Sequence, residues 1–418
     1  MWALRNYKTS VISTSFARYC LIKPNQALLI FIIMGIILVS LRPIHAKEIL
    51  VGDDASLKIA LIGANPGDEI RIKPGRYKGG TYFKGLAGSA LKPIVISASD
   101  PTQRPVFVGG ESALHLSQVS YLKIDGLEIT KSTANGLNID HGGDISNPSH
   151  HIILKNLTIS EIGDRGNHDG IKLSGVDHFQ VRNCQIQNWG GSGSAIDMVG
   201  CHDGLVYETL FRGRGDDQSN GVQVKSGSSE IAIQACRFEY AGSRAVNLGG
   251  STGLTYFSPK DASYEARNLK VIDCLVLGSH APIAFVGVDG AILRQNTFIN
   301  PGKYLFRILQ EQQDLRFVRC RLGVIEKNLV LYNGNQVSQS TNIGPGTDSA
   351  SFELKANCWS EMSGVLRPLT HGIPEKNGIY NIKPTFLDIK LDDYRQAPDS
   401  ESRQYGSQSD WASKPHPR

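Results

Sequence analysis

The segment EIAIQACRF, residues 230–238, carries the pattern that decides the fold. Ile231 and Ile233 are separated by one residue, and after two intervening residues Cys236 and Phe238 follow with the same separation. The spacing recurs in YLKIDGLEI (121–129), HIILKNLTI (151–159), HFQVRNCQI (178–186) and NLKVIDCLV (268–276). Period-2 alternation over so few residues predicts short strands, and the recurrence predicts stacked coils of β-structure.

Nine repeats share one position at the end of the first strand. The position of Cys236 recurs at intervals of 22 to 38 residues and is held by Leu127, Leu157, Cys184, Leu210, Cys236, Cys274, Asn296, Asn328 and Asn357. Because successive coils of a solenoid lie on one another, we expect one buried column of these residues. We interpret the cysteines as core thiols and the asparagines as amides that hydrogen-bond along the axis. Disulfide bonds are the alternative, because residues 47–418 contain six cysteines.

A second short strand follows the first one in the middle coils. The segments are GLNI (136–139), GIKL (170–173), AIDM (195–198), GVQV (221–224), AVNL (245–248) and PIAF (282–285). Their apolar residues point into the core, so the residue between them points outward. The outward column is Asn138, Lys172, Asp197, Gln223, Asn247, Ala284 and Arg307. Two strands per coil, with no helical periodicity between them, predict a parallel β-solenoid.

The chain ends differ from the repeats. A basic start without acids precedes an apolar stretch at 27–41, which predicts a secretory signal peptide over residues 1–46. An uncleaved anchor is the alternative, although a membrane span needs about 20 residues. The segment 54–63 predicts a cap helix with Asp54 at its N-cap. We expect residues 47–400 to form the solenoid and the polar tail 401–418 to be disordered.

The net charge of +5 belongs to the first 46 residues, because the rest of the chain holds 39 Lys and Arg against 39 Asp and Glu. A neutral body without a basic stripe argues against a nucleic-acid-binding protein. The predicted leader places the body outside the cytoplasm, secreted or periplasmic. We expect no membrane span in the mature chain, which we take to be a monomer.

The chain resembles the right-handed parallel β-helix proteins of the pectin-lyase-like class. The resemblance covers about residues 48–400, and its segments are PGDEIRIKPGRYKGG (66–80), KPIVISASDPTQRPVFVGG (92–110), the nine repeats and KPTFLDIKLDDYRQAPDS (383–400). It implies an all-β fold, a right-handed parallel β-helix with an N-terminal cap helix. It is less specific for chemistry, because the fold holds lyases, hydrolases, epimerases and adhesins.

Three long loops follow the same second strand and predict the wall of a groove. They cover residues 140–151, 251–268 and 310–320. Loops inserted after the same strand emerge along one edge of a solenoid. Tyr256 and Tyr264 lie in the second loop and offer flat faces to sugar rings, although for each ring alone packing of the loop against the solenoid is the favoured explanation.

The segment RGRGDDQSNGVQVK, residues 212–225, contains the densest group of polar residues. Asp216, Asp217 and Asn220 provide oxygen ligands on a bendable turn, as Ca²⁺ requires, although the same residue types are common in solvated turns. The turn resembles the Ca²⁺-binding turn of β-helical pectate lyases that use a lysine as base. This chain has Asn220 where those enzymes have a third acid, so the resemblance implies a weaker site.

Elimination from a uronic acid needs a cation at the carboxylate and a base for the C5 proton. Lys225 and Arg244 lie within one predicted coil of the acidic turn, and Lys172, two coils away, is the third candidate base. The segment NHDGIKLSG (167–175) carries a further resemblance to the chondroitinase and alginate lyase group, which implies a Lys and an Arg near the ion. The substrate-binding candidates are Asp197, Gln223, Asn247, Arg307, Tyr256 and Tyr264.

Three functions remain open from the sequence. The first is a lyase that cleaves an acidic polysaccharide by β-elimination, with Ca²⁺ as a candidate cofactor. The second is a glycoside hydrolase that pairs Asp197 with Asp216 or Asp217. The third is a non-catalytic protein that binds glycans or builds a surface structure.

Overall fold

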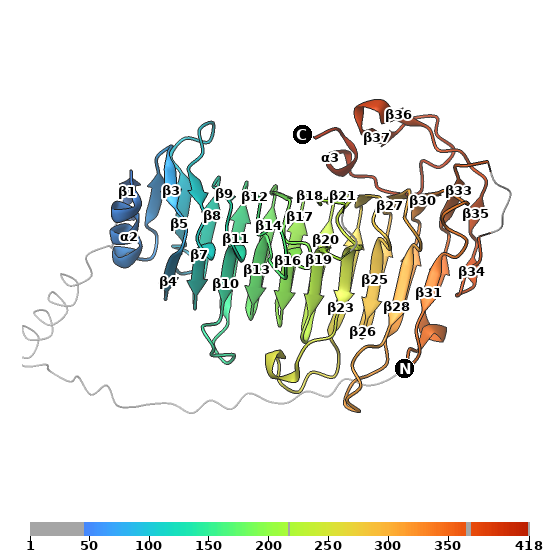
Figure 1. Cartoon of the computed structure of the whole chain (residues 1–418), viewed down its shortest axis with the longest axis horizontal. Helices are drawn as coiled ribbons and strands as arrows, with labels where there is room; N and C mark the ends of the chain where they lie inside the picture. The colour runs from blue at the N-terminus through green and yellow to red at the C-terminus, as the bar shows by residue number, and fades with distance from the viewer. Residues whose placement is uncertain (1–45, 216–217, 365–368, 417–418) are drawn as a thin grey trace, which may run out of the picture. The chain divides into compact units, whose positions relative to one another are not determined.

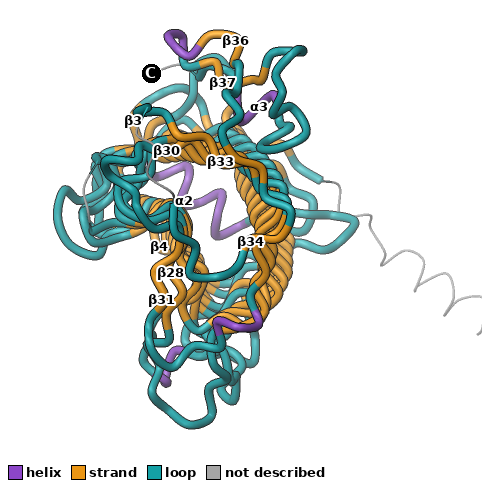
Figure 2. Tube along the Cα trace, turned by 90° about the vertical axis from the view of Figure 1, so that its right-hand side faces the viewer, coloured by secondary structure: helices purple, strands orange, loops and turns teal. Residues whose placement is uncertain are grey.

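The computed structural model describes residues 46–215, 218–364 and 369–416. Three long parallel sheets run side by side around one core, and each central coil of the chain contributes a strand to each sheet (Figure 1). Figure 2 looks nearly along the axis and shows the three sheets as the walls of a tube. The parallel β-solenoid expected from the repeats is confirmed.

Sheet A has 13 strands over the described residues. They are β1 (Glu48–Val51), β2 (Glu69–Ile72), β5 (Ile94–Ala98), β8 (Ser120–Asp125), β11 (Ser149–Lys155), β14 (Val176–Arg182), β17 (His202–Tyr207), β20 (Ser228–Gln234), β23 (Ala266–Ile272), β26 (Val288–Arg294), β29 (Arg321–Glu326), β32 (Glu353–Lys355) and β34 (Glu375–Lys376).

Sheet B has 12 short strands within the described ranges. They are β3 (Arg76–Lys78), β6 (Val106–Val108), β9 (Glu128–Thr130), β12 (Thr158–Ser160), β15 (Gln185–Gln187), β18 (Leu210–Arg212), β21 (Arg237–Glu239), β24 (Leu275–Leu277), β27 (Thr297–Ile299), β30 (Leu329–Tyr332), β33 (Cys358–Glu361) and β35 (Ile379–Tyr380).

Sheet C has ten strands in the described part of the chain. They are β4 (Thr81–Lys84), β7 (Ser112–Ser117), β10 (Asn135–Asp140), β13 (Ile171–Ser174), β16 (Ser194–Val199), β19 (Asn220–Lys225), β22 (Arg244–Gly249), β25 (Ile283–Val286), β28 (Phe306–Leu309) and β31 (Thr341–Ile343). Sheet C contains the predicted second strands, whereas the nine repeats supply sheets A and B.

The shared position of the repeats lies at the bend between sheets A and B. Eight of the nine predicted residues are buried there, and the cysteines are free thiols. The prediction of Leu210 is wrong by one residue. Strand β18 pairs Leu210 with Gln185, so Thr209 lies in the column beside Cys184. The sequence pattern places this coil in the wrong register because Gly204 occupies a position that is apolar in the neighbouring coils. The Phe179 ring fills the space that a side chain at Gly204 would take.

The asparagines of the column form the predicted ladder. Asn328 Oδ1 accepts hydrogen bonds from the backbone N and the Nδ2 of Asn296, at 2.9 and 3.0 Å. Asn328 Nδ2 donates to Asn357 Oδ1 at 2.9 Å. All three side chains are fully or almost fully buried. The ladder therefore satisfies polar groups that the interior would otherwise leave without partners.

We expect Asn328→Ala to lower the free energy of unfolding by about 2 kcal/mol, because it leaves buried groups of Asn296 and Asn357 unsatisfied. Urea denaturation followed by circular dichroism measures this loss. Asn335→Ala is the matched control, because Asn335 is exposed and its removal should change stability by about 0.5 kcal/mol at most. Equal stability of both variants would contradict the ladder.

Helix α2 (Asp54–Gly63) lies at the N-terminal end of the described coils (Figures 1 and 2). It spans the predicted residues and buries Leu57 and Leu61 in the main core. Its N-cap is Asp53 instead of the predicted Asp54, since the Asp53 carboxylate accepts a 2.7 Å hydrogen bond from Ser56 N. The tube interior is therefore continuous with the apolar face of this helix.

The tail after residue 400 differs from the expected disorder. Helix α3 (Asp410–Ser413) lies beside the antiparallel pair β36 (Phe386–Asp388) and β37 (Asp393–Gln396), above the middle of sheet B (Figure 1). The fully buried Arg237 donates through Nη1 to the carbonyl of Lys414 at 2.9 Å. Ser407 N donates to Thr297 Oγ1 at 2.9 Å. The polar composition of the tail predicted disorder, because composition does not show that residues of distant strands form hydrogen bonds with the tail.

Candidate functional site

Sheet C carries one row of outward side chains along its length. The register pairs Asn138, Lys172, Asp197, Gln223, Asn247, Ala284 and Arg307 on successive strands from β10 to β28. The row extends to His115 on β7 and Asn342 on β31. The predicted column is confirmed, and neighbouring members lie on strands about 4.8 Å apart.

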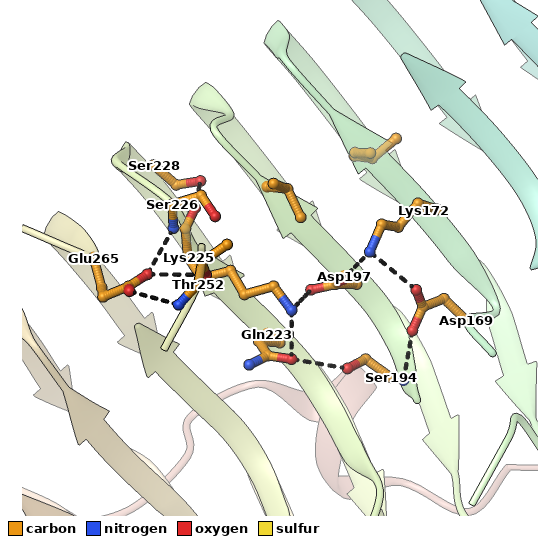
Figure 3. Close-up of polar contacts among 12 residues, drawn as sticks. Asp169, Lys172, Ser194, Asp197, Gln223, Lys225, Ser226, Ser228, Thr252 and Glu265 are labelled. Carbon is orange, nitrogen blue, oxygen red and sulfur yellow. Dashed lines mark hydrogen bonds and ion pairs between the residues drawn. The ribbon is translucent and has the colours of Figure 1, made fainter. Parts of the chain in front are cut away.

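Two charged members of this row and two neighbours outside it form the lysine–carboxylate cluster (Figure 3). The cluster consists of Lys172 and Asp197 in the row, Asp169 before β13 and Lys225 at the end of β19. Lys172 Nζ donates to Asp197 Oδ2 and lies 3.3 Å from Asp169 Oδ2. Lys225 Nζ lies 3.1 Å from Asp197 Oδ1. Only 2% of Asp169 and 1% of Asp197 is exposed, so the charges of the carboxylates are compensated inside the protein.

The cluster sets the protonation of its members. Burial, together with the neighbouring Asp197 carboxylate, raises the pKa of Asp169 to about 6. Burial opposes the charged form of Lys172, but the Asp197 and Asp169 carboxylates outweigh it and raise the pKa of this lysine above its usual value. A lysine held in the protonated form does not accept a proton. The raised pKa and the two carboxylate contacts therefore speak against Lys172 as a base.

Lys225 and Arg244 converge on the same pair of amides. Lys225 Nζ donates to Gln223 Oε1 at 3.2 Å, and Arg244 Nη1 donates to Asn247 Oδ1 at 3.1 Å. Gln223 and Asn247 are direct register partners on β19 and β22. Each cation thus reaches along its own strand to one of two amides that are neighbours in the register. Asn247 is only 1% exposed and Asp197 is equally buried, so both hold the cations in place rather than contact a substrate directly.

Arg307 adds a third cation beyond this pair. It lies on β28, where Ala284 separates it from Asn247 in the row, and its Nε donates to Asn342 Oδ1 at 3.3 Å. Burial, and then the positive charge of Arg307, lowers the pKa of Arg244 from its ordinary value. Arg244 is therefore the candidate base for which the structure shows a shift toward proton release.

Two long loops are tied to the edge of sheet C beside Lys225. The fully buried Glu265 accepts hydrogen bonds from Ser226 N at 2.9 Å, Thr252 N at 2.9 Å and Gln312 Nε2 at 2.6 Å (Figure 3). These contacts join loop 251–268, loop 310–320 and the end of β19. The loops after β10, β22 and β28 extend on the same side of the solenoid (Figure 1). The predicted position of loop 251–268 next to Lys225 is confirmed.

The two tyrosines expected to contact sugars have different surroundings. Tyr264 is 5% exposed and packs in an apolar cluster with Phe257 and Phe317, beneath the Arg267 guanidinium. Its role is to fasten the two loops to each other, so the expectation of a sugar platform is wrong for this residue. Tyr256 is 66% exposed and remains available for a ligand.

The proposed Ca²⁺ site lies partly outside the described residues. Asp216 and Asp217 are among those not described, whereas Asn220 begins β19 next to Arg244 in the register. Among the described residues, no group of three or more His, Cys, Asp or Glu is arranged to hold a metal ion. The nearby acids Asp169 and Asp197 are paired with lysines. The described part therefore does not provide a Ca²⁺ ligand set by itself.

Two further residues organise the site. The sequence suggested Asp169, with Asn167, His168 and Asp197, only as a residue that could complete the Ca²⁺ shell, whereas in the structure its carboxylate accepts a hydrogen bond from Ser194 N of the next coil at 2.8 Å and pairs with Lys172. Glu265 stands alone in loop 251–268. Asp169 occupies the repeated position before the second strand, but the residue type varies there among Asn135, Ser194, Asn220 and Arg244, so the repeat does not mark its role. Glu265 belongs to no repeated position.

Residues 112–298 match the protein family described as "Right handed beta helix region". The chain is a right-handed parallel β-helix. No curated protein matches it in sequence. This β-helix superposes on pectate lyase Pel9A with a TM-score of 0.56 at 15% identity, over 86% of this chain and 91% of the lyase.

Two further solved structures superpose on this chain, and the first of them, with a TM-score above 0.5, shares the fold. A rhamnogalacturonan lyase superposes with a TM-score of 0.53 at 15% identity, over 75% of this chain and 87% of that one. An alginate lyase from Paenibacillus gives a TM-score of 0.49 at 19% identity, over 80% and 97% of the two chains. The β-helix thus resembles polysaccharide lyases in architecture. No helix in the described ranges is long and apolar enough to cross a membrane.

Proposed function

We propose that this β-helix is an exported lyase that cleaves a uronic-acid-containing polysaccharide by β-elimination. The observation that carries the proposal is the convergence of Lys225 and Arg244 on the Gln223–Asn247 pair, with Arg307 beyond it. Three cations on a partly buried strip give an acidic sugar a place to bind with its carboxylate neutralised. Export rests on the leader at 1–46, which lies almost entirely outside the described residues.

The reaction follows from the roles that these side chains can take. Arg307 and Lys172 bind uronate carboxylates, which stabilises the negative charge that develops when the C5 proton leaves. Arg244 takes this proton, and the C5–H electron pair forms the C4–C5 double bond. The C4–O bond breaks, and Lys225 protonates the departing oxygen. Atoms and charge balance when the two side chains exchange their protons with water after each turnover.

Product analysis on a panel of pectate, alginate and glycosaminoglycans tests the proposal. Elimination produces an unsaturated uronate, which is detected by its ultraviolet absorbance. A lyase gives rising absorbance together with shorter chains. Absence of unsaturated products on every acidic glycan would refute it.

A glycoside hydrolase is the second candidate, and one observation favours it. Asp169 and Asp197 are a pair of buried carboxylates, and the pKa of Asp169 is raised to about 6, which suits a general acid. The lysines bound to both residues weigh against free access of a sugar to this pair. The same product assay discriminates, because hydrolysis leaves saturated ends and a new reducing sugar.

We further propose Ca²⁺ as a cofactor held by Asp216, Asp217 and Asn220. We expect chelation with EGTA to lower kcat/KM about tenfold or more, because the ion would neutralise the substrate carboxylate next to Lys225. Added Ca²⁺ should restore activity, whereas Mg²⁺ should restore less of it. Activity that is unchanged after chelation and dialysis contradicts a role for Ca²⁺ and leaves the three cations of sheet C as the anion-binding groups.

A further inference from the structure

The N-terminal end of sheet C carries a polar and aromatic group that the proposed chemistry does not use. Tyr82 and Lys84 lie on β4 and are both exposed, Tyr82 to 57%. Phe83 between them packs against the core. Because side chains alternate along a strand, Tyr82 and Lys84 point outward, on the same face of the sheet as Lys225. The register places Tyr82 in the row that continues through His115.

Neighbouring strands hold this group in a defined arrangement. The rings of Tyr82 and His115 meet edge to face, with centroids 4.9 Å apart. His115 Nε2 lies 2.6 Å from Asp140 Oδ2, and Ser117 Oγ donates to Asp140 Oδ1 at 2.6 Å. Burial opposes ionisation of Asp140, but the hydrogen bonds from Ser117 and His115 outweigh it and keep the pKa of this carboxyl below its usual value. The imidazole beside Tyr82 is therefore fixed by a charged partner.

An exposed aromatic ring beside a lysine suits an acidic sugar. A pyranose packs its C–H face on an aromatic ring, and an ammonium group attracts the carboxylate of a uronic acid. The core does not require Tyr82, since more than half of its surface is in solvent. We propose that Tyr82 and Lys84, supported by His115, form a distal subsite for a uronic acid residue of the polysaccharide.

The position of the subsite defines how a chain lies on the protein. Strands β4, β7, β10, β13, β16 and β19 are consecutive neighbours, so Tyr82 lies five strand spacings, about 24 Å, from Lys225. Polar side chains of Asn138 and Lys172 fill the row between them. A glycan that touches both ends therefore runs parallel to the solenoid axis over several sugar residues. This inference rests on the proposed function, because it concerns the same acidic glycan.

Simultaneous contact at both ends makes affinity depend on chain length. Binding is measured by titration calorimetry with disaccharides and with long oligosaccharides of pectate, alginate and glycosaminoglycans, whether or not the protein cleaves them. The measurements use the Arg244→Ala background so that the ligand stays intact. We expect Tyr82→Ala to weaken binding of the long oligosaccharides about tenfold and to leave disaccharide binding within about twofold.

Two further variants make the test specific. Lys84→Ala should weaken binding of the long chain about threefold and reduce the dependence of binding on salt, because an exposed charge acts through a screened attraction. Tyr240→Ala is the matched control, because Tyr240 is 59% exposed but follows β21 in sheet B. It should leave both affinities unchanged.

The outcomes separate this inference from the proposed function. Unchanged binding of the long chain in Tyr82→Ala, or an equal loss in Tyr240→Ala, overturns the subsite while the lyase proposal stands. Length-dependent binding through Tyr82 without any unsaturated product supports the subsite and overturns the lyase proposal. A protein that binds no acidic glycan overturns both.

Discussion

Arg244→Ala should lower kcat on the preferred uronate polymer about 10³-fold and leave the fold intact. Burial, and then the charge of Arg307, lowers the pKa of the Arg244 guanidinium, and the hydrogen bond to Asn247 holds it against sheet C. Removal of the side chain takes away the group that accepts the C5 proton. Initial rates of unsaturated product at saturating substrate measure the loss. Thermal unfolding shows that the variant folds.

The matched control is Arg76→Ala, because Arg76 is exposed on β3 and belongs to sheet B. Its rate should equal that of the unchanged protein. Since only neutral Arg244 accepts a proton, kcat of the unchanged enzyme should rise toward alkaline pH. Full activity of Arg244→Ala would show that another group is the base. Lys225→Ala is then the next variant, and full activity in both variants excludes elimination at this part of sheet C.

The repeats could be predicted from the sequence because each coil repeats the same packing problem. An inward-pointing apolar pair, a bend and a further apolar residue recur in each coil that lies on a neighbour. This periodicity was enough to predict which residues, from Asn138 to Arg307, form the outward row of sheet C. The pattern failed at Leu210, where Gly204 gives its space to the Phe179 ring of the preceding coil. A glycine can occupy an inward position of a coil when a neighbouring side chain fills the space, so the apolar pattern is absent from the sequence there.

The pairing within the site could not be predicted in the same way. The register placed Lys172 next to Asp197, but it did not show that Asp169 and Lys225 turn toward the same carboxylate. Side-chain direction along a strand depends on rotamers and on neighbours from other coils. Tyr264 shows the same limit, since its burial depends on Phe317 from a loop about fifty residues further along the chain.

The largest expected effect on stability is that of Asp197→Ala. The substitution removes the carboxylate shared by Lys172 and Lys225 at a position that is 1% exposed. Breaking a buried ion pair from one side costs about 3–5 kcal/mol, because the remaining charge loses its partner without regaining water. Urea denaturation at neutral pH measures this loss. Asp203→Ala is the control, because the Asp203 side chain is 51% exposed and its partner His178 is 3.5 Å away, so its removal should cost about 1 kcal/mol at most.

The pH dependence of stability gives a second measurement on the same variant. The folded-state pKa of Asp169 is about 6, above its value of about 3.9 in an unfolded chain. The folded state thus holds this proton more tightly, and the resulting stability is full below about pH 4 and is lost as pH rises through about 6. Asp197→Ala removes a like charge that raises the pKa of Asp169, while Lys172 remains next to Asp169. Between about pH 4 and pH 6, the free energy of unfolding should therefore fall less in this variant than in the unchanged protein. Two results together would show that the carboxylates and their lysines are not coupled. Asp197→Ala would be as stable as Asp203→Ala, and its free energy of unfolding would fall between these pH values by the same amount as that of the unchanged protein.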